Sequence, residues 1–230
     1  MPLPRTPEPE LMDSATEADD YDRMDFSAVN DRFMQDARSF FGSPKALLDV
    51  GTGTGRIPLA FVPGGLPETF VAVDAAPAML ARAEANRHAT RGADPIRFVE
   101  GNATALAFDA LSFDAVMSNS LVHHLPSPVP FFREVARVCR SGGKVFLRDL
   151  ARPESAARVD ELTSTYAAIP ADAEGTDRER FERQRMLFHA SLHAAFTVDE
   201  VRAMAAVAGL LGADVRMTSD RHWTLTWTKP

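Results

Sequence analysis

The residues with the clearest chemical potential lie in a glycine-rich turn that follows a short apolar run. The turn reads Asp49-Val50-Gly51-Thr52-Gly53-Thr54-Gly55, and its glycines let the backbone turn sharply and approach a bound molecule closely. A dinucleotide-binding turn would place its third glycine where this chain has Arg56. The spacing is therefore G-x-G-x-G. This disfavours a nicotinamide cofactor, because the glycine that packs the following helix in a dinucleotide-binding turn is absent.

A carboxylate ends the next apolar run. Asp74 closes the segment 69–74 and could accept hydrogen bonds from both hydroxyls of an adenosine ribose. The alternative is a turn residue at the end of a strand.

Further polar side chains follow the later apolar runs. Asn119, His123 and His124 come after 113–118, and Arg148 and Asp149 end the run that starts at 144. Either histidine could act as a general base or make a structural hydrogen bond. Arg148 and Asp149 could contact an acceptor or form a salt link to another segment.

No metal site is predicted. His189 and His193 are four residues apart, but no Glu-containing metal motif accompanies them.

Short apolar runs that alternate with helical stretches must position these residues. Strands are predicted over 46–50, 69–74, 96–99, 113–118 and 144–147, with two more over 213–217 and 223–228. This alternation predicts an α/β fold, a Rossmann-like doubly wound sheet of seven strands that is mostly parallel with an antiparallel last strand. Ligands of such sheets bind outside the carboxyl ends of the strands, where the polar residues fall.

The chain divides into four predicted parts. Residues 1–45 form an arm, poorly ordered or docking to about residue 20, and a lid helix over 21–41. Residues 46–150 form the cofactor-binding core, 151–196 a helical cap insertion, and 197–230 a helix and strands that complete the core.

Composition limits the partners. The 230 residues carry a formal net charge of -7, which disfavours nucleic acid because phosphate binding needs clustered Lys and Arg. One cysteine, no apolar leader segment and no apolar run of about 20 residues predict a cytoplasmic protein without a membrane span. The oligomeric state stays open.

Five ordered segments carry a family resemblance: LLDVGTGTGRIPLAF, VAVDAAPAML, FVEGNATALAF, FDAVMSNSLVHHL and FREVARVCRSGGKVFLRDL. Over about 47–150 the chain resembles class I S-adenosylmethionine methyltransferases, and within them the group similar to ubiquinone/menaquinone C-methyltransferases. The resemblance implies S-adenosylmethionine as cofactor and a small-molecule methyl acceptor.

The resemblance also implies residue roles. Gly51 and Gly53 would pass beneath the methionine part of the cofactor, Asp49 would help to hold its ammonium group, and Asp74 would bind the ribose. Asn102 stands where this family commonly has Asp and would face the adenine amino group. The implied cofactor set is Asp49, Gly51, Thr52, Gly53, Asp74, Ala75, Met79, Asn102, Ala103 and Asn119. Asp49 could instead tie down the loop, Asn102 could form a turn, and Met79 could pack in the core.

Residues on the acceptor side are proposed more broadly. The catalytic candidates are His123, His124 and Asn119, and the substrate-binding candidates are Tyr21, Arg148, Asp149, His189 and Arg221. The expected reaction is methyl transfer to O, N, C or S of the acceptor. The alternatives are a non-catalytic S-adenosylmethionine-binding module or partner subunit, and an NAD-dependent oxidoreductase.

Overall fold

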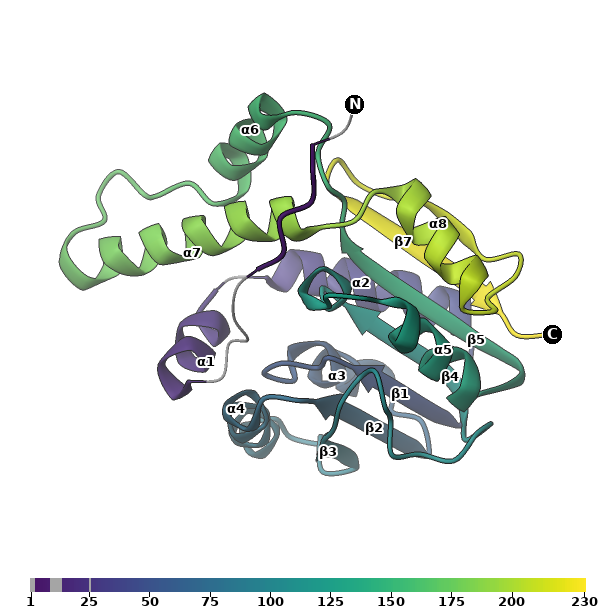
Figure 1. The fold of residues 1–230 in the computed structure, drawn as a ribbon. Coiled ribbons are helices and arrows are strands. Elements are labelled where there is room, and N and C mark those ends of the chain that lie inside the picture. The colour runs from purple at the N-terminus through teal and green to yellow at the C-terminus, as the bar shows by residue number, and fades with distance from the viewer. Residues whose placement is uncertain (1–2, 9–13, 25) are drawn as a thin grey trace.

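The computed structural model describes residues 3–8, 14–24 and 26–230, and a seven-stranded sheet forms its centre (Figure 1). The strand order is β3-β2-β1-β4-β5-β7-β6. The strands of this described part are β1 (Ala46–Val50), β2 (Thr69–Asp74), β3 (Ile96–Glu100), β4 (Phe113–Asn119), β5 (Cys139–Leu150), β6 (Asp214–Met217) and β7 (His222–Thr228).

Strand direction follows the predicted pattern. The ladders β1–β2, β1–β4, β2–β3 and β4–β5 are parallel, whereas β7 runs antiparallel to both β5 and β6. Six strands therefore share one direction and β7 opposes them, which confirms the Rossmann-like doubly wound fold. One boundary differs clearly: β5 begins at Cys139 rather than at 144, because Cys139 pairs with Phe113 across an irregularity in the ladder.

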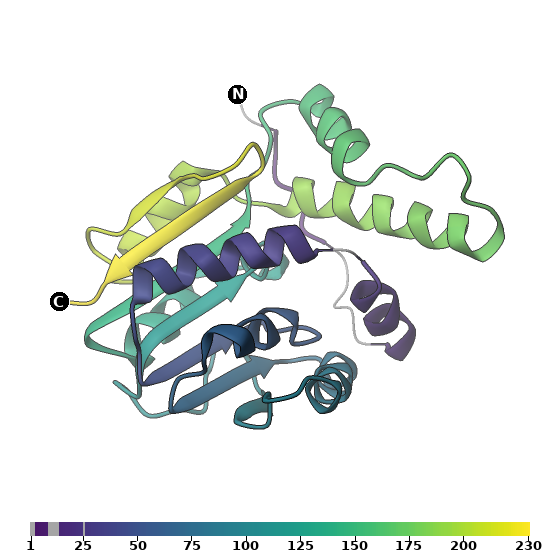
Figure 2. The same cartoon turned by 180° about the vertical axis from the view of Figure 1, so that it is seen from behind.

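Helices cover both faces of the sheet, which explains why β1 is buried at every position. On one face α2 (Ser27–Phe41) and α3 (Arg56–Ala60) pack against Leu47, Phe70 and Phe146. On the other, α5 (Val129–Val138) and α8 (Val198–Val207) pack against alternate residues of the same strands. Figure 2 shows α2 lying across its face, while α4 (Pro77–Ala89) contacts β2 and β3.

The N-terminal segment differs from the prediction of one helix over 21–41. Two helices are present, α1 (Ala15–Asp22) and α2, and α1 lies partly in the segment expected to be poorly ordered. A capping box starts α1: the Ser14 hydroxyl accepts from Glu17 N, and the Glu17 carboxylate accepts from Ser14 N. Residues 3–8 of the predicted arm are described, whereas 1–2 and 9–13 lie outside the described residues.

Beyond β5 the chain forms α6 (Ala156–Tyr166) and α7 (Gly175–Ala194), which project from the sheet in Figure 1. Residues 3–8 run between α7 and the core, where Thr6 N donates to His193 O at 3.0 Å. Leu3 packs with Leu150, Val159 and Leu192. Within the described ranges, no helix has the length and apolar character needed to cross a membrane.

Candidate functional site

The glycine turn joins β1 to α3 at the carboxyl edge of the sheet. Gly51 and Gly53 have φ angles of +76° and +56°, a region that side chains disfavour. A Cβ on Gly51 would lie 2.9 Å from Leu121 Cδ1, so the turn also depends on glycine for space. Gly51 N and Thr52 N both donate to Val73 O, which holds the turn against β2.

Asp74 sits across the turn at the end of β2. Its Oδ2 accepts from Gly53 N at 2.7 Å and its Oδ1 accepts from Ala76 N at 3.0 Å. A carboxylate has about four acceptor sites, so both oxygens keep capacity for ribose hydroxyls. The side chain therefore braces the turn and can still receive a ligand.

Two buried oxygens next to the turn have no hydrogen-bond partner among the described residues. They are Oδ2 of Asp49 on β1 and Oδ1 of Asn119 on the neighbouring strand β4. Asp49 is only 2% exposed, and this burial, with the nearby charge of Asp74, raises the pKa of its carboxyl to about 7. Unpaired buried acceptors are costly, so both atoms fit the donors of a ligand ammonium group.

Tyr21 covers the turn from α1. A Cβ built on Gly53 would lie 3.8 Å from Tyr21 Cε1, so the ring stands directly above this glycine. Burial, together with the charges of Asp74 and Asp149, raises the pKa of Tyr21 to about 12. The phenol therefore stays protonated and remains a hydrogen-bond donor at neutral pH.

The neighbouring Asp22 fastens α1 to the core. Its carboxylate accepts from Arg56 Nε at 2.8 Å, Arg82 Nε at 2.9 Å and Asn86 Nδ2 at 2.9 Å. Burial opposes ionisation, but these hydrogen bonds lower the pKa of Asp22 to about 2. A fully ionised carboxylate thus holds Tyr21 over the glycine turn.

This arrangement predicts the effect of Asp22→Asn. The variant leaves two arginines without their anion, a loss of roughly 1.5–3 kcal/mol for charged hydrogen bonds. We expect limited proteolysis to cut α1 about tenfold faster than in the wild type. Asp20→Asn on the same helix is the matched control, because Asp20 is less buried than Asp22 and pairs with a single arginine, Arg183, whose side chain is half-exposed. Equal cutting of the two variants would contradict the role of Asp22.

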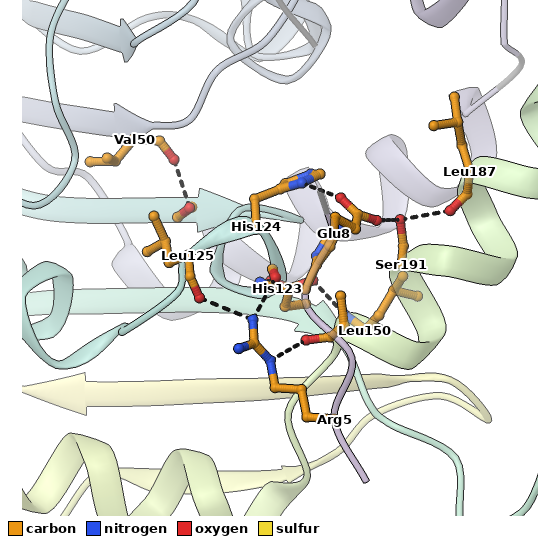
Figure 3. Close-up of polar contacts among 12 residues, drawn as sticks. Arg5, Glu8, Val50, His123, His124, Leu125, Leu150, Leu187 and Ser191 are labelled. Atoms are coloured by element: carbon orange, nitrogen blue, oxygen red, sulfur yellow. Dashed lines mark hydrogen bonds and ion pairs between the residues drawn. The ribbon is translucent and has the colours of Figure 1, made fainter. Parts of the chain in front are cut away.

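Each histidine of the pair after β4 has its own carboxylate, and Figure 3 shows Glu8 facing His124. His123 Nδ1 lies 2.6 Å from Asp149 Oδ1, and His123 N donates to Asp149 Oδ2 at 2.9 Å. His124 Nδ1 lies 2.6 Å from Glu8 Oε2. Both rings are therefore held by carboxylates, and the predicted catalytic roles of His123, His124 and Asn119 stay predictions.

The substrate-binding candidates are dispersed. Arg148 is buried against α2, where it donates to Asp36 and Thr224. Arg221 stacks on Tyr166 of α6, with 3.4 Å from its Cζ to the ring centroid. His189 lies half-exposed on α7, apart from the glycine turn. Of the five candidates, Tyr21 is beside the turn and Asp149 holds His123.

The remaining cofactor candidates differ in their surroundings. Asn102 Oδ1 is the acceptor expected for the adenine amino group. It accepts hydrogen bonds from Thr104 N and Thr104 Oγ1, each at 2.8 Å. Met79 is buried and packs with Ala18 and Ala76. Ala75 is exposed, Ala103 is partly buried, and the Thr52 hydroxyl is buried with no partner in the described chain.

Sequence reasoning missed Glu8 and Asp22. Glu8 lies in a proline-rich segment without periodicity, so nothing in the sequence connects it to His124 more than a hundred residues away. A signal for α1 was present, because Ser14 and Glu17 have the capping-box spacing. Locating α1 would have placed Tyr21 and Asp22 at its last turn.

A family model described as "Methyltransferase domain" matches residues 48–147. Among curated proteins, the chain is 34% identical over 108 residues to the uncharacterized methyltransferase YcgJ of Bacillus subtilis, covering 47% of this chain and 42% of that protein. It is 40% identical over 109 residues to the demethylmenaquinone methyltransferase of Roseiflexus castenholzii, covering 46% and 43%. The chain thus spans less than half the length of these two relatives.

Solved structures share the fold over more of the chain. Phosphoethanolamine N-methyltransferase 2 of Haemonchus contortus, in complex with S-adenosyl-L-methionine, superposes with a TM-score of 0.65 at 14% identity. This superposition covers 94% of the present chain and 57% of that structure.

Proposed function

We propose that residues 48–147, which match the methyltransferase-domain model, form a class I S-adenosylmethionine methyltransferase domain, and that the chain transfers a methyl group from that cofactor to a small-molecule acceptor. The methylated atom is O, N, C or S. The proposal places the reaction in the cytoplasm, because the single cysteine suits a reducing compartment.

One observation carries the proposal: two buried oxygens beside the glycine turn have no hydrogen-bond donor among the described residues. Asp49 Oδ2 and Asn119 Oδ1 fit the ammonium of the methionine part, and Asp74 fits the ribose hydroxyls. These groups lie at the carboxyl ends of β1, β4 and β2, the edge where such sheets bind ligands. The residues present therefore fit S-adenosylmethionine.

The protein's own contribution is mainly positioning. When bound, the sulfonium cofactor supplies an activated methyl group, and transfer is an in-line displacement. The enzyme must align the acceptor and exclude water. Tyr21 on α1 stands above Gly53, and Asp22 keeps it there, so α1 is suited to close the site over the cofactor.

The acceptor is proposed to be small rather than a nucleic acid. The formal net charge of -7 disfavours phosphate binding, and segment 3–8 and α7 already lie beside the histidine loop. The relative from Roseiflexus castenholzii is named as a demethylmenaquinone methyltransferase, and for the present chain we propose only a small-molecule acceptor.

Calorimetric binding tests this proposal. S-adenosylmethionine and S-adenosylhomocysteine are expected to bind with micromolar dissociation constants, while NAD gives no signal. A subsequent screen of acceptors for production of S-adenosylhomocysteine separates an enzyme from a binding module without catalysis. Binding of NAD alone would overturn both the cofactor and the reaction.

A further inference from the structure

Glu8, His123 and His124 bring three metal-ligand groups together beside the proposed acceptor side of the site. One potential ligand atom from each residue lies within 4.8 Å of the other two. The three come from distant parts of the chain: Glu8 from the N-terminal segment and the histidines from the loop after β4. We propose that they bind a divalent transition-metal ion of the Zn²⁺ type, a site separate from that of the cofactor.

The donor set matches this class of ion. Imidazole nitrogens and one carboxylate are common ligands of Zn²⁺ and related ions, with bonds of about 2.0–2.2 Å. Ligand atoms of a tetrahedral ion then lie roughly 3.3 Å apart. The 2.6 Å contact between His124 Nδ1 and Glu8 Oε2 must therefore widen slightly, and the ion takes the place of the proton between them. That proton passes to solvent.

Outer partners already orient two of the three ligands. Asp149 holds Nδ1 of His123 at 2.6 Å, which leaves Nε2 as the ring nitrogen free to bind a metal. The Ser191 hydroxyl donates to Glu8 Oε1, the oxygen that does not face His124 (Figure 3). Carboxylate and hydroxyl partners of this kind fix ligand orientation in metal sites. A hydrogen bond between Glu8 and His124 does not need the His123 ring beside it, whereas a metal ion uses all three groups.

Charge also favours a divalent cation. Glu8 and Asp149 each place a carboxylate oxygen 2.6 Å from a ring nitrogen of one of the two histidines. Arg5 is the nearby cation, but its guanidinium is engaged with the carbonyl oxygens of His123, Leu125 and Ala194. Three protein ligands leave a fourth position open, which is typical of sites that also receive a small molecule.

Titration calorimetry of the full, tag-free chain with Zn²⁺ alone tests the site. We expect one equivalent to bind with a dissociation constant of micromolar or lower. Glu8→Gln and His124→Gln should each weaken binding at least tenfold. Ser191→Ala should weaken it roughly tenfold, the lower end of the effect of losing an outer partner. Glu8 lies outside the sheet and helices, so Glu8→Gln is expected to fold. The circular dichroism spectrum of this variant checks that it does.

His189 and His193 provide the matched control. Their ring centroids lie 4.9 Å apart on α7 with the planes tilted by 46°, so they offer another pair of neighbouring imidazoles that could bind zinc. His189→Gln should leave the affinity unchanged. Binding that disappears in His189→Gln but persists in Glu8→Gln would overturn the proposal, as would no binding at all. The Glu8–His124 contact would then be only a hydrogen bond.

Co²⁺ gives a second readout that does not depend on activity. The Co²⁺-loaded wild type is expected to show visible absorption typical of a four- or five-coordinate ion, and Glu8→Gln should lose it. This test of the metal site does not require methyl transfer. The affinity of Glu8→Gln for S-adenosylhomocysteine should equal that of the wild type. Loss of Zn²⁺ binding with retained cofactor binding therefore addresses this site alone.

Discussion

Replacing Asp74 with alanine is expected to weaken the binding of S-adenosylhomocysteine by about 1–3 kcal/mol, the scale of lost charged hydrogen bonds. This corresponds to roughly 5- to 150-fold in the dissociation constant. The carboxylate has two tasks, because it braces Gly53 N and Ala76 N and also faces the expected ribose position. Alanine removes both, so the turn loses a brace at the point where the ligand loses its acceptor. Calorimetry at fixed pH and salt measures the change.

Asp74→Asn removes only part of each task. Its amide oxygen can still accept from Gly53 N, whereas its amide nitrogen can accept neither from Ala76 N nor from a ribose hydroxyl. We expect both the affinity and the thermal stability to lie between those of the wild type and the alanine variant. An alanine variant that binds with unchanged affinity would rule out the ribose assignment of Asp74.

The sheet could be predicted from the sequence because its information is local. Each central strand is a short apolar run between turn signals, and β1 and β2 fall within the predicted ranges 46–50 and 69–74. The start of β5 could not be predicted, since Ser141-Gly142-Gly143 favours a turn. The strand extends to Cys139 because Cys139 pairs with Phe113 and because Gly142 and Gly143 form backbone hydrogen bonds with Lys229. The helix predicted over 21–41 is longer than α2, because helical spacing alone does not locate the break after Asp22.

The candidate site was predictable only where function and strand ends coincide. Asp74 and Asn119 end strands and Asp49 is the last residue but one of β1, so the topology brings them to one edge without any knowledge of side-chain contacts. Arg148 lies near the carboxyl end of β5, yet its side chain turns to Asp36 on α2, because alternate residues of β5 face opposite sides of the sheet. Glu8 and Asp22 act through long-range pairing, which no spacing in the sequence encodes.

Asp49→Asn is expected to have opposite effects on stability and on cofactor binding. In the folded cofactor-free protein, burial raises the pKa of Asp49 to about 7, above the value near 3.9 of an unfolded chain. Between these values the folded state retains a proton that the unfolded state has released, so stability falls as pH rises through this window. Above pH 7 the full cost is present, on the order of 4 kcal/mol.

Asparagine carries no titrating proton and has a similar shape. The cofactor-free variant should therefore be more stable than the wild type at pH 8, with the two converging toward pH 4, as measured by urea unfolding. S-adenosylmethionine affinity should instead fall by about 3 kcal/mol, because its ammonium loses a buried anionic partner. Wild-type affinity should also rise from pH 6 to pH 8, while that of the variant stays nearly flat.

These opposite signs distinguish the two roles open to Asp49. If the carboxylate merely tied down the glycine turn, asparagine would lower the stability of the cofactor-free protein and affect binding only through that loss. Its Oδ2 has no hydrogen-bond partner in the described chain, and Thr52 is the group of the turn whose side chain opposes the rise in the pKa of Asp49. A less stable variant at pH 8 would therefore show that the turn, and not the cofactor, is what this carboxylate serves. A more stable variant that binds poorly would show that the fold tolerates an uncompensated buried acid for the sake of the ligand.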